Sequence, residues 1–226
     1  MKERLFMNPI GFIKPIRPEY VHFYIHMRQD PTYTLNDDLS LFIKGKETKD
    51  QIKSILNRTL SDQDDESLFR YHSFSTSNQA FYYYALSCLA YPFFRDTVEY
   101  IGKQFRLHDH VTTRQIQHHL KSIYGNRRRV EVAVASVLST LYYWNLIDRP
   151  KIGVYSKVVC EIDFKFHIAL MIEVLMQSVN HSSISKETLE YNSIFFPFHY
   201  DVTIADVKEE NYRVIPTIRD TIIERA

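Results

Sequence analysis

The sequence predicts a mostly helical α+β fold, and three observations lead to this prediction. Apolar residues recur at helical spacing in three successive stretches in the middle of the chain, and a hairpin pattern follows them. Further helical patterns precede this segment, and a helix with strand-like runs follows it. We therefore expect an N-terminal region of short helices at 1–75, a helical core with the central segment at 76–163, and a C-terminal helix with a small antiparallel sheet at 164–226.

Two helix patterns stand before the central segment. Residues 47–60 carry Ile52, Ile55 and Leu56 among Lys and Asp residues, which predicts a short amphipathic helix. Residues 78–91 are apolar nearly all round, which predicts a buried helix that ends or bends at Pro92. Residues 62–66 are predicted as a solvated acidic loop, and residues 20–27 fit a strand and a helix equally well.

The central segment has the most regular pattern of the chain. A first helix, which ends before a loop at 108–110, is indicated by the spacing of Phe94, Val98, Ile101 and Phe105. A second helix begins after Thr112 or Thr113 as N-cap and ends at Gly125. Its apolar stripe consists of Ile116, Leu120 and Ile123. The third helix has the longest stripe, which consists of Val130, Ala133, Val134, Val137, Leu138 and Leu141. A turn at 148–153 and a strand at 154–160 predict a hairpin.

Three helices followed by a β-hairpin, with a short turn between the second and third helices, resemble a winged helix-turn-helix over residues 93–157. The resemblance implies that the third helix enters the major groove of double-stranded DNA with its N-terminus first. The charge distribution agrees with such a partner. Residues 91–157 carry 11 basic and 5 acidic side chains, against 11 and 11 in residues 1–90 and 6 and 11 in residues 158–226.

The predicted DNA-binding side chains come from the second helix, the third helix and the wing. At the N-terminus of the third helix, Arg127, Arg128 and Arg129 can meet phosphates or guanine. The rest of its polar side is expected to face the groove with Glu131, Ala135, Ser136, Ser139 and Tyr143. Phosphate contacts are expected from Arg114, His118 and Lys121 of the second helix and from Arg149, Lys151, Tyr155 and Lys157 of the wing.

The C-terminal third is predicted to contain a buried helix at 167–179 and a short helix after Ser185. Strand-like runs at 198–204, 212–215 and 218–223 then predict the small antiparallel sheet. This order of helix, helix and hairpin is weakly similar to that of the central segment, but it does not predict a second winged helix.

Two other functions fit parts of the sequence. Glu161, Asp163 and Lys165 alternate as on one strand face, with Asp148 upstream, and this resembles the acidic-x-Lys signature of restriction-type nucleases, whose carboxylates hold magnesium. In the other reading, a scaffold docks its basic segment onto an acidic protein partner or onto the acidic C-terminal third. The sequence does not distinguish DNA from RNA as the partner, and it leaves open whether the protein forms a homodimer.

No active site, cofactor or metal site is expected. The histidine pairs at 22 and 26, 108 and 110, and 118 and 119 lack a third ligand, and no Gly-rich phosphate loop occurs. Cys88 and Cys160 lie in apolar surroundings without CxxC spacing, so we expect reduced core cysteines in a cytoplasmic protein. Residues 73–94 carry no formal charge, but their polar first third leaves too short an apolar stretch for a membrane span.

The order and character of the helices give a second resemblance. A buried helix at 80–91, an amphipathic helix at 93–105 and a late helix ending in Leu146 and Ile147 are similar to those of the small DNA-binding proteins of BREX phage-defence islands. This resemblance implies a non-enzymatic bacterial protein that binds DNA in a regulatory, architectural or phage-defence role.

Overall fold

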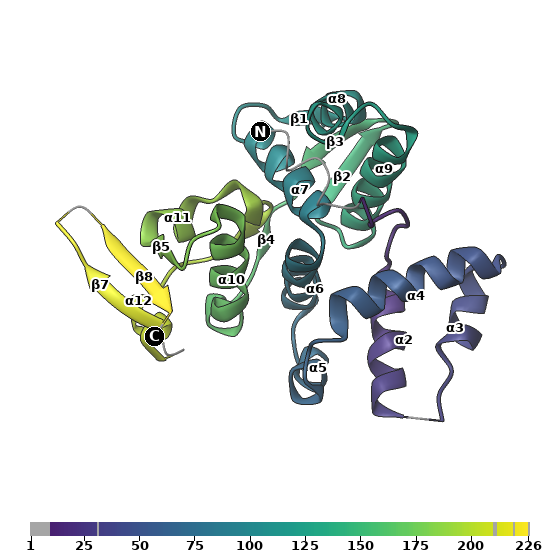
Figure 1. The fold of residues 1–226 in the computed structure, drawn as a ribbon, viewed down its shortest axis with the longest axis horizontal. Helices are drawn as coiled ribbons and strands as arrows, with labels where there is room; N and C mark the ends of the chain where they lie inside the picture. Colours follow the sequence, from purple (N-terminus) through teal and green to yellow (C-terminus); the bar gives the residue numbers. More distant parts are fainter. Residues whose placement is uncertain (1–9, 31, 210–211, 219, 226) are drawn as a thin grey trace.

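The computed structural model of the chain describes residues 10–30, 32–209, 212–218 and 220–225 (Figure 1). Helices dominate these residues, and three small sheets accompany them. The fold is therefore α+β and mostly helical, as the sequence predicts.

The N-terminal part is formed by α2 (Pro18–Gln29), α3 (Leu35–Phe42), α4 (Lys46–Leu60) and α5 (Asp65–Tyr71). Helix α4 confirms the amphipathic helix, and residues 20–27 belong to α2. The acidic loop is shorter than predicted. The Asp64 carboxylate accepts a hydrogen bond from the Ser67 N–H at 2.8 Å and caps α5, so Asp65 and Glu66 form the first turn of that helix.

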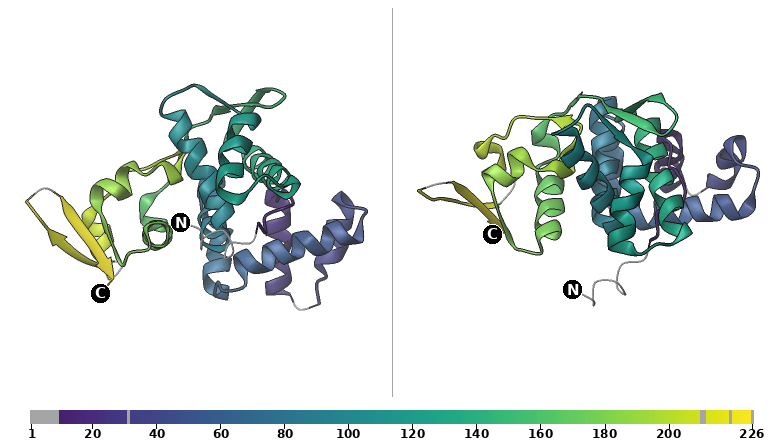
Figure 2. Two further views of the ribbon diagram at one scale, coloured as in Figure 1. Left: turned by 45° about the horizontal axis from the view of Figure 1, so that its top comes forward. Right: turned by 90° about the horizontal axis from the view of Figure 1, so that it is seen from above.

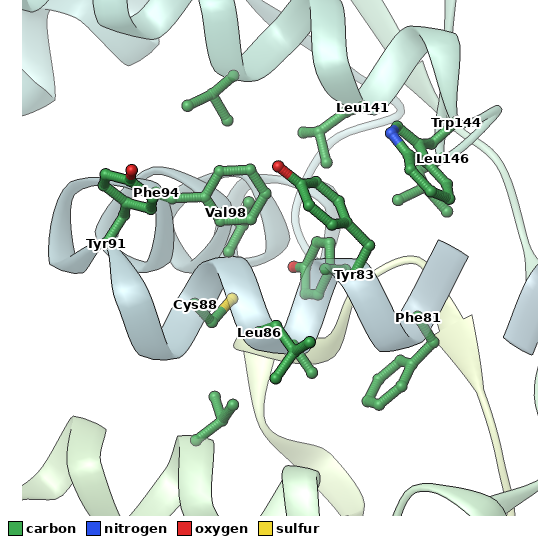
Figure 3. Close-up of a cluster of buried hydrophobic side chains, with 14 of the residues drawn as sticks. Phe81, Tyr83, Leu86, Cys88, Tyr91, Phe94, Val98, Leu141, Trp144 and Leu146 are labelled. Carbon is green, nitrogen blue, oxygen red and sulfur yellow. The ribbon is translucent and has the colours of Figure 1, made fainter. Parts of the chain in front are cut away.

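Helix α6 (Thr76–Ala90) is the central element of the core and lies between the N-terminal helices and the C-terminal third (Figure 1). It is buried nearly all round, as predicted, because different sides of it meet different parts of the chain. Tyr83 lies toward Leu141 and Trp144, whereas Phe81 and Leu86 lie on the opposite side (Figure 3). The rings of Tyr83 and Trp144 stack with centroids 5.2 Å apart, which joins α6 to the central segment.

The central segment consists of α7 (Pro92–Phe105), β1 (His110–Thr112), α8 (Thr113–Tyr124), α9 (Arg128–Tyr143), β2 (Ile147–Lys151) and β3 (Val154–Lys157). Its three helices pack with an antiparallel sheet of strand order β1-β3-β2. The loop predicted at 108–110 runs into β1, because β3 offers this short segment a pairing partner. Strand β2 includes residues 148–151, which were predicted as a turn, and β3 ends at Lys157 rather than at residue 160.

Local sequence signals set the bounds of α8. Thr112 forms a capping box: its hydroxyl accepts from the Gln115 N–H at 3.2 Å, and the Gln115 side chain accepts from the Thr112 N–H at 2.8 Å. Gly125 ends the helix with a φ of 88°, which favours glycine. The predicted stripe of α9 is buried throughout. In α8, Tyr124 completes the buried stripe instead of Ile123, which is 40% exposed.

The C-terminal third contains β4 (Cys160–Glu161), α10 (Ile168–Val179), β5 (Ser183–Ser185), α11 (Lys186–Tyr191), β6 (Phe198–His199), α12 (Ile204–Glu209), β7 (Tyr212–Pro216) and β8 (Thr221–Arg225). The two predicted helices are confirmed as α10 and α11. The strand predicted at 198–204 is wrong beyond its first two residues, since β6 is short, pairs in parallel with β4, and is followed by α12. The antiparallel sheet takes β5 as its third strand.

This third repeats the topology of the central segment. Both contain a helix, a strand, two further helices and a hairpin in this order, although β6 stands between α11 and α12 in the C-terminal third, and in both the first strand of the sheet pairs with the last, in the orders β1-β3-β2 and β5-β8-β7. Thr112 and Ser185 cap the helix after the first strand at matching places. The likeness is thus closer than the sequence indicates. The copies differ in size, because α12 has 6 residues against 16 in α9, and the β7–β8 hairpin extends away from the molecule (Figures 1 and 2).

The cysteines differ in burial. Cys88 lies in the core of α6, as expected, whereas Cys160 is only half-buried, so the prediction of a core residue is wrong there. Burial raises the pKa of both thiols. Among the described residues, no helix has both the length and the apolar character that crossing a bilayer requires.

Candidate nucleic-acid interface

Helix α9 turns its apolar stripe toward the core and leaves a narrow outward face. Residues 10–17 run along one flank of this face in the same direction as the helix. Near the start of α9, Arg129 Nε donates to the Ile10 carbonyl at 3.1 Å. At its end, Trp144 Nε1 donates to the Ile16 carbonyl at 3.1 Å. The N-terminal segment therefore forms part of the surface that surrounds the outward face of α9.

This segment changes the role of two residues predicted to face the groove. Ser136 is only 5% exposed, and its hydroxyl donates to the Val132 carbonyl at 2.9 Å, so little of its side chain is open to a partner. Tyr143 is half-buried, and the Arg17 guanidinium lies 4.4 Å from its ring centroid. Ser139 is half-buried and lies at the edge of the same face.

A shallow groove of about 380 Å³ lies between the N-terminal segment, α8 and α9. Its lining consists of Ile13, Lys14, Pro15, Gln117, Arg128, Glu131, Val132, Ala135, Ser136 and Ser139. Small side chains form its α9 side, and charged side chains stand at the first turn of α9. The groove therefore gives access both to the outward face of α9 and to the charged side chains at the N-terminus of that helix.

The three consecutive arginines have different environments. Arg127 Nη2 donates to the Tyr124 carbonyl at 2.7 Å, and Arg129 is held at Ile10. Arg128 has a side chain that is 87% exposed, and its Nη1 lies 2.9 Å from the Glu131 carboxylate. Only Arg128 therefore extends from the first turn of α9 into the groove.

Glu131 joins α8 to α9 on this surface. Lys121 Nζ of α8 lies 2.5 Å from one carboxylate oxygen, and Arg128 Nη1 bonds the other. The hydrogen bonds from Lys121 and Arg128 lower the pKa of Glu131, so the carboxyl group is ionised at neutral pH. The sequence predicts that Lys121 contacts a phosphate. In the structure its ammonium group instead forms an ion pair with the Glu131 carboxylate.

The other predicted residues of α8 are open to solvent. Arg114 and His118 are exposed on the side that borders Lys121. The neighbouring His119 instead stacks on Tyr100 with centroids 4.0 Å apart, and burial lowers its pKa. The two adjacent histidines thus face different surroundings, and only His118 belongs to the outward surface.

Three of the four hairpin residues that were predicted to contact phosphates are open to solvent. Arg149, Lys151 and Lys157 are exposed, and the Arg149 guanidinium lies 5.3 Å from the Tyr142 ring centroid. Tyr155 pairs with Val111 across the sheet and is 8% exposed, so its prediction as a phosphate contact is wrong. Side chains alternate along a strand, and Tyr155 is on the side that faces the helices.

We call the basic face the exposed cations of these elements whose side chains do not bond a backbone carbonyl; it consists of Arg114, Arg128, Arg149, Lys151 and Lys157, and leaves out Arg127 and Arg129. The C-terminal third packs elsewhere, against α7. A Cβ at Gly102 of α7 would lie 2.0 Å from the Ser193 carbonyl oxygen, which shows how close this contact is. The Arg106 guanidinium donates to the Tyr191 carbonyl, and Arg95 Nη1 bonds Gln177 at 2.6 Å. Lys157 borders this contact, because it lines a pocket with Glu190 and Tyr191, whereas the other four cations of the basic face are open to solvent.

The acidic-x-Lys pattern does not form one strand face. Glu161 lies in β4 and bonds His199 at 2.9 Å, whereas Asp163 caps a 3₁₀ helix that contains Lys165. The predicted alternation is wrong because β4 has only two residues. Within the described part of the chain, no group of three or more His, Cys, Asp or Glu residues is placed to hold a metal ion.

Comparison with known proteins gives no match to a family model, to a curated protein or to a solved structure. The function is therefore inferred from this surface alone.

Sequence reasoning missed the contribution of the N-terminal segment. Lys14 and Pro15 line the groove together with Gln117 of α8 and Val132 of α9. Pro15 and Pro18 disfavour a helix for the residues before them, so the sequence does indicate an extended segment there. It carries no signal that this segment lies on α9, since the contacts span more than a hundred residues.

Proposed function

We propose that the central segment is a winged helix-turn-helix and that the protein binds double-stranded DNA through it. Helix α9 would enter the major groove with its first turn, and the β2–β3 hairpin would act as the wing. The order of elements and the strand order β1-β3-β2 support this proposal. The role would be regulatory or architectural, or that of a phage-defence accessory in a cytoplasmic protein.

The observation that carries the proposal is the coincidence of the groove and the basic face on the same elements. Cations of α8, α9 and the hairpin surround an outward helix face with small side chains, and all of them except Lys157 are away from the C-terminal third. Cations of this kind bind phosphates and orient the protein, while the helix face reads base edges. The Glu131 carboxylate offsets part of the positive charge of this surface, and it would repel a phosphate placed next to it.

Fluorescence anisotropy with a labelled duplex of about 30 base pairs, roughly three helical turns, tests the proposal. The variant Arg114→Ala/Arg128→Ala/Lys151→Ala removes one cation each from α8, α9 and the hairpin. The matched control Lys44→Ala/Lys46→Ala/Arg70→Ala removes three exposed cations from the N-terminal part of the chain. We expect the first variant to lose binding while it keeps the wild-type circular dichroism spectrum, and the control to bind as the wild type does.

Competition separates the alternatives. Unlabelled duplex DNA is expected to displace the probe at lower concentration than duplex RNA of the same sequence, because the proposed helix fits the wide major groove of B-DNA and not the narrow one of A-form RNA. Absence of duplex binding by the wild type, even at low salt, would contradict the proposal and favour a protein-interaction scaffold.

A further inference from the structure

The first turn of α9 offers the groove two side chains that work as a pair. Arg127 and Arg129 are held by backbone carbonyls on either side of the turn. Arg128 and Glu131 remain, and their charged groups lie 2.9 Å apart. Because one base-pair step rises only about 3.4 Å, two groups this close reach the same base pair or its neighbour.

The chemistry of the pair is complementary to one base pair in particular. The guanidinium has five N–H donors, so it can keep its contact with Glu131 and still donate to the O6 and N7 acceptors of guanine. An ionised carboxylate can only accept, and in the major groove its best partner is the N4 amino group of cytosine. Both partners occur on the major-groove edge of a C·G pair.

Glu131 is also kept in its ionised, oriented form before any DNA arrives. Lys121 holds one oxygen and Arg128 the other, and Ala135, one turn further along α9, leaves the approach open. A carboxylate in this position repels phosphates, so it favours only those sites where a base donor meets it. This explains why an acidic residue stands in the middle of a basic surface.

We propose that Arg128 and Glu131 together read a C·G base pair beneath the first turn of α9. This inference rests on the proposed function and adds to it the base pair that the site contains.

Selection of duplexes from a randomised library tests the inference, with wild type, Glu131→Gln and the control Glu99→Gln. Glu99 lies on α7 and pairs with Lys103, so the control removes the same charge away from the groove. The wild type is expected to enrich one invariant C·G position, and its replacement by A·T should weaken binding roughly tenfold. Since a glutamine amide pairs with adenine N6 and N7, Glu131→Gln should shift the preference at that position toward A·T. The control should select the wild-type site.

The outcomes separate this inference from the proposed function. If Glu131 only joins α8 to α9, the glutamine variant will lose thermal stability and still select the wild-type base pair, and this result would overturn the inference alone. Enrichment without any C·G position would overturn it as well. A wild type that retains no duplexes from the library contradicts the proposed function itself.

Discussion

The salt dependence of the proposed DNA binding can be worked out from the described side chains. Binding of each cation to a phosphate releases a counterion and contributes about −0.9 to the slope of log affinity against log salt. Three cations of the basic face, Arg114, Arg149 and Lys151, neither pair with Glu131 nor border the C-terminal third, so the slope should be about −2.7, and affinity should fall roughly 40-fold between about 50 and 200 mM salt. Lys121, Arg127, Arg128 and Arg129 are left out of this number because Glu131 and backbone carbonyls hold them, and Lys157 is left out because it lines a pocket with the C-terminal third.

Anisotropy titrations over a salt series measure this slope directly. Removal of Lys151 should make the slope shallower by about 0.9, with a similar loss of affinity on every duplex sequence, because phosphate contacts carry no base information. Arg70→Ala should leave the slope unchanged, since Arg70 lies on α5 and pairs with Glu66. A slope near −7 would show that the five omitted cations also reach phosphates. A wild-type slope shallower than about −2, or one unaffected by Lys151→Ala, would refute the assignment of the basic face.

Three predictions concern stability, each checked by urea unfolding. Gly102→Ala should destabilise the protein by about 1–3 kcal/mol, because the new Cβ would clash with the Ser193 carbonyl oxygen 2.0 Å away. Thr112→Ala should cost about 1 kcal/mol through loss of the α8 capping box, and Thr112→Ser should restore most of it. Burial lowers the pKa of His167 to about 4, below the unfolded value of about 6.5, so its stabilising contribution is complete above pH 6.5 and lost as the pH falls toward 4. This loss should reach about 3 kcal/mol by pH 4 in the wild type, and a His167→Gln variant with the same acid sensitivity would contradict it.

The helices of the central segment could be predicted because their signals are local. The α9 stripe repeats with the helical period over several turns, and Thr112 and Gly125 mark the ends of α8 within the sequence itself. Strand β1 has no such signal. It has three residues, and its partner β3 lies more than forty residues further on, so only the folded chain reveals the pairing.

The candidate site could be predicted in its charges but not in its contacts. The sequence shows three adjacent arginines, and helical geometry sends them in different directions, one of them toward Ile10. Ser136 lies on the polar side of α9 by periodicity, yet residues 10–17 cover that flank. Tyr155 is polar at its tip and apolar in its ring, and strand alternation placed it inside. For Arg129, Ser136 and Tyr155 the deciding neighbour is distant in sequence.

The repeated topology does not imply a repeated function. The counterpart of α9 in the C-terminal third is α12, which is less than half as long and carries Asp206 in its first turn. Carboxylates of this third pair within it, as Glu173 does with Arg225 and Glu224 does with Arg213. Residues 158–226 carry 11 acidic against 6 basic side chains, and this negative excess disfavours the binding of phosphates. If the proposed function holds, the second unit supports it by packing on α7 through the close contact at Gly102, which holds α7 in place behind α8 and α9 while their outward faces stay free for DNA.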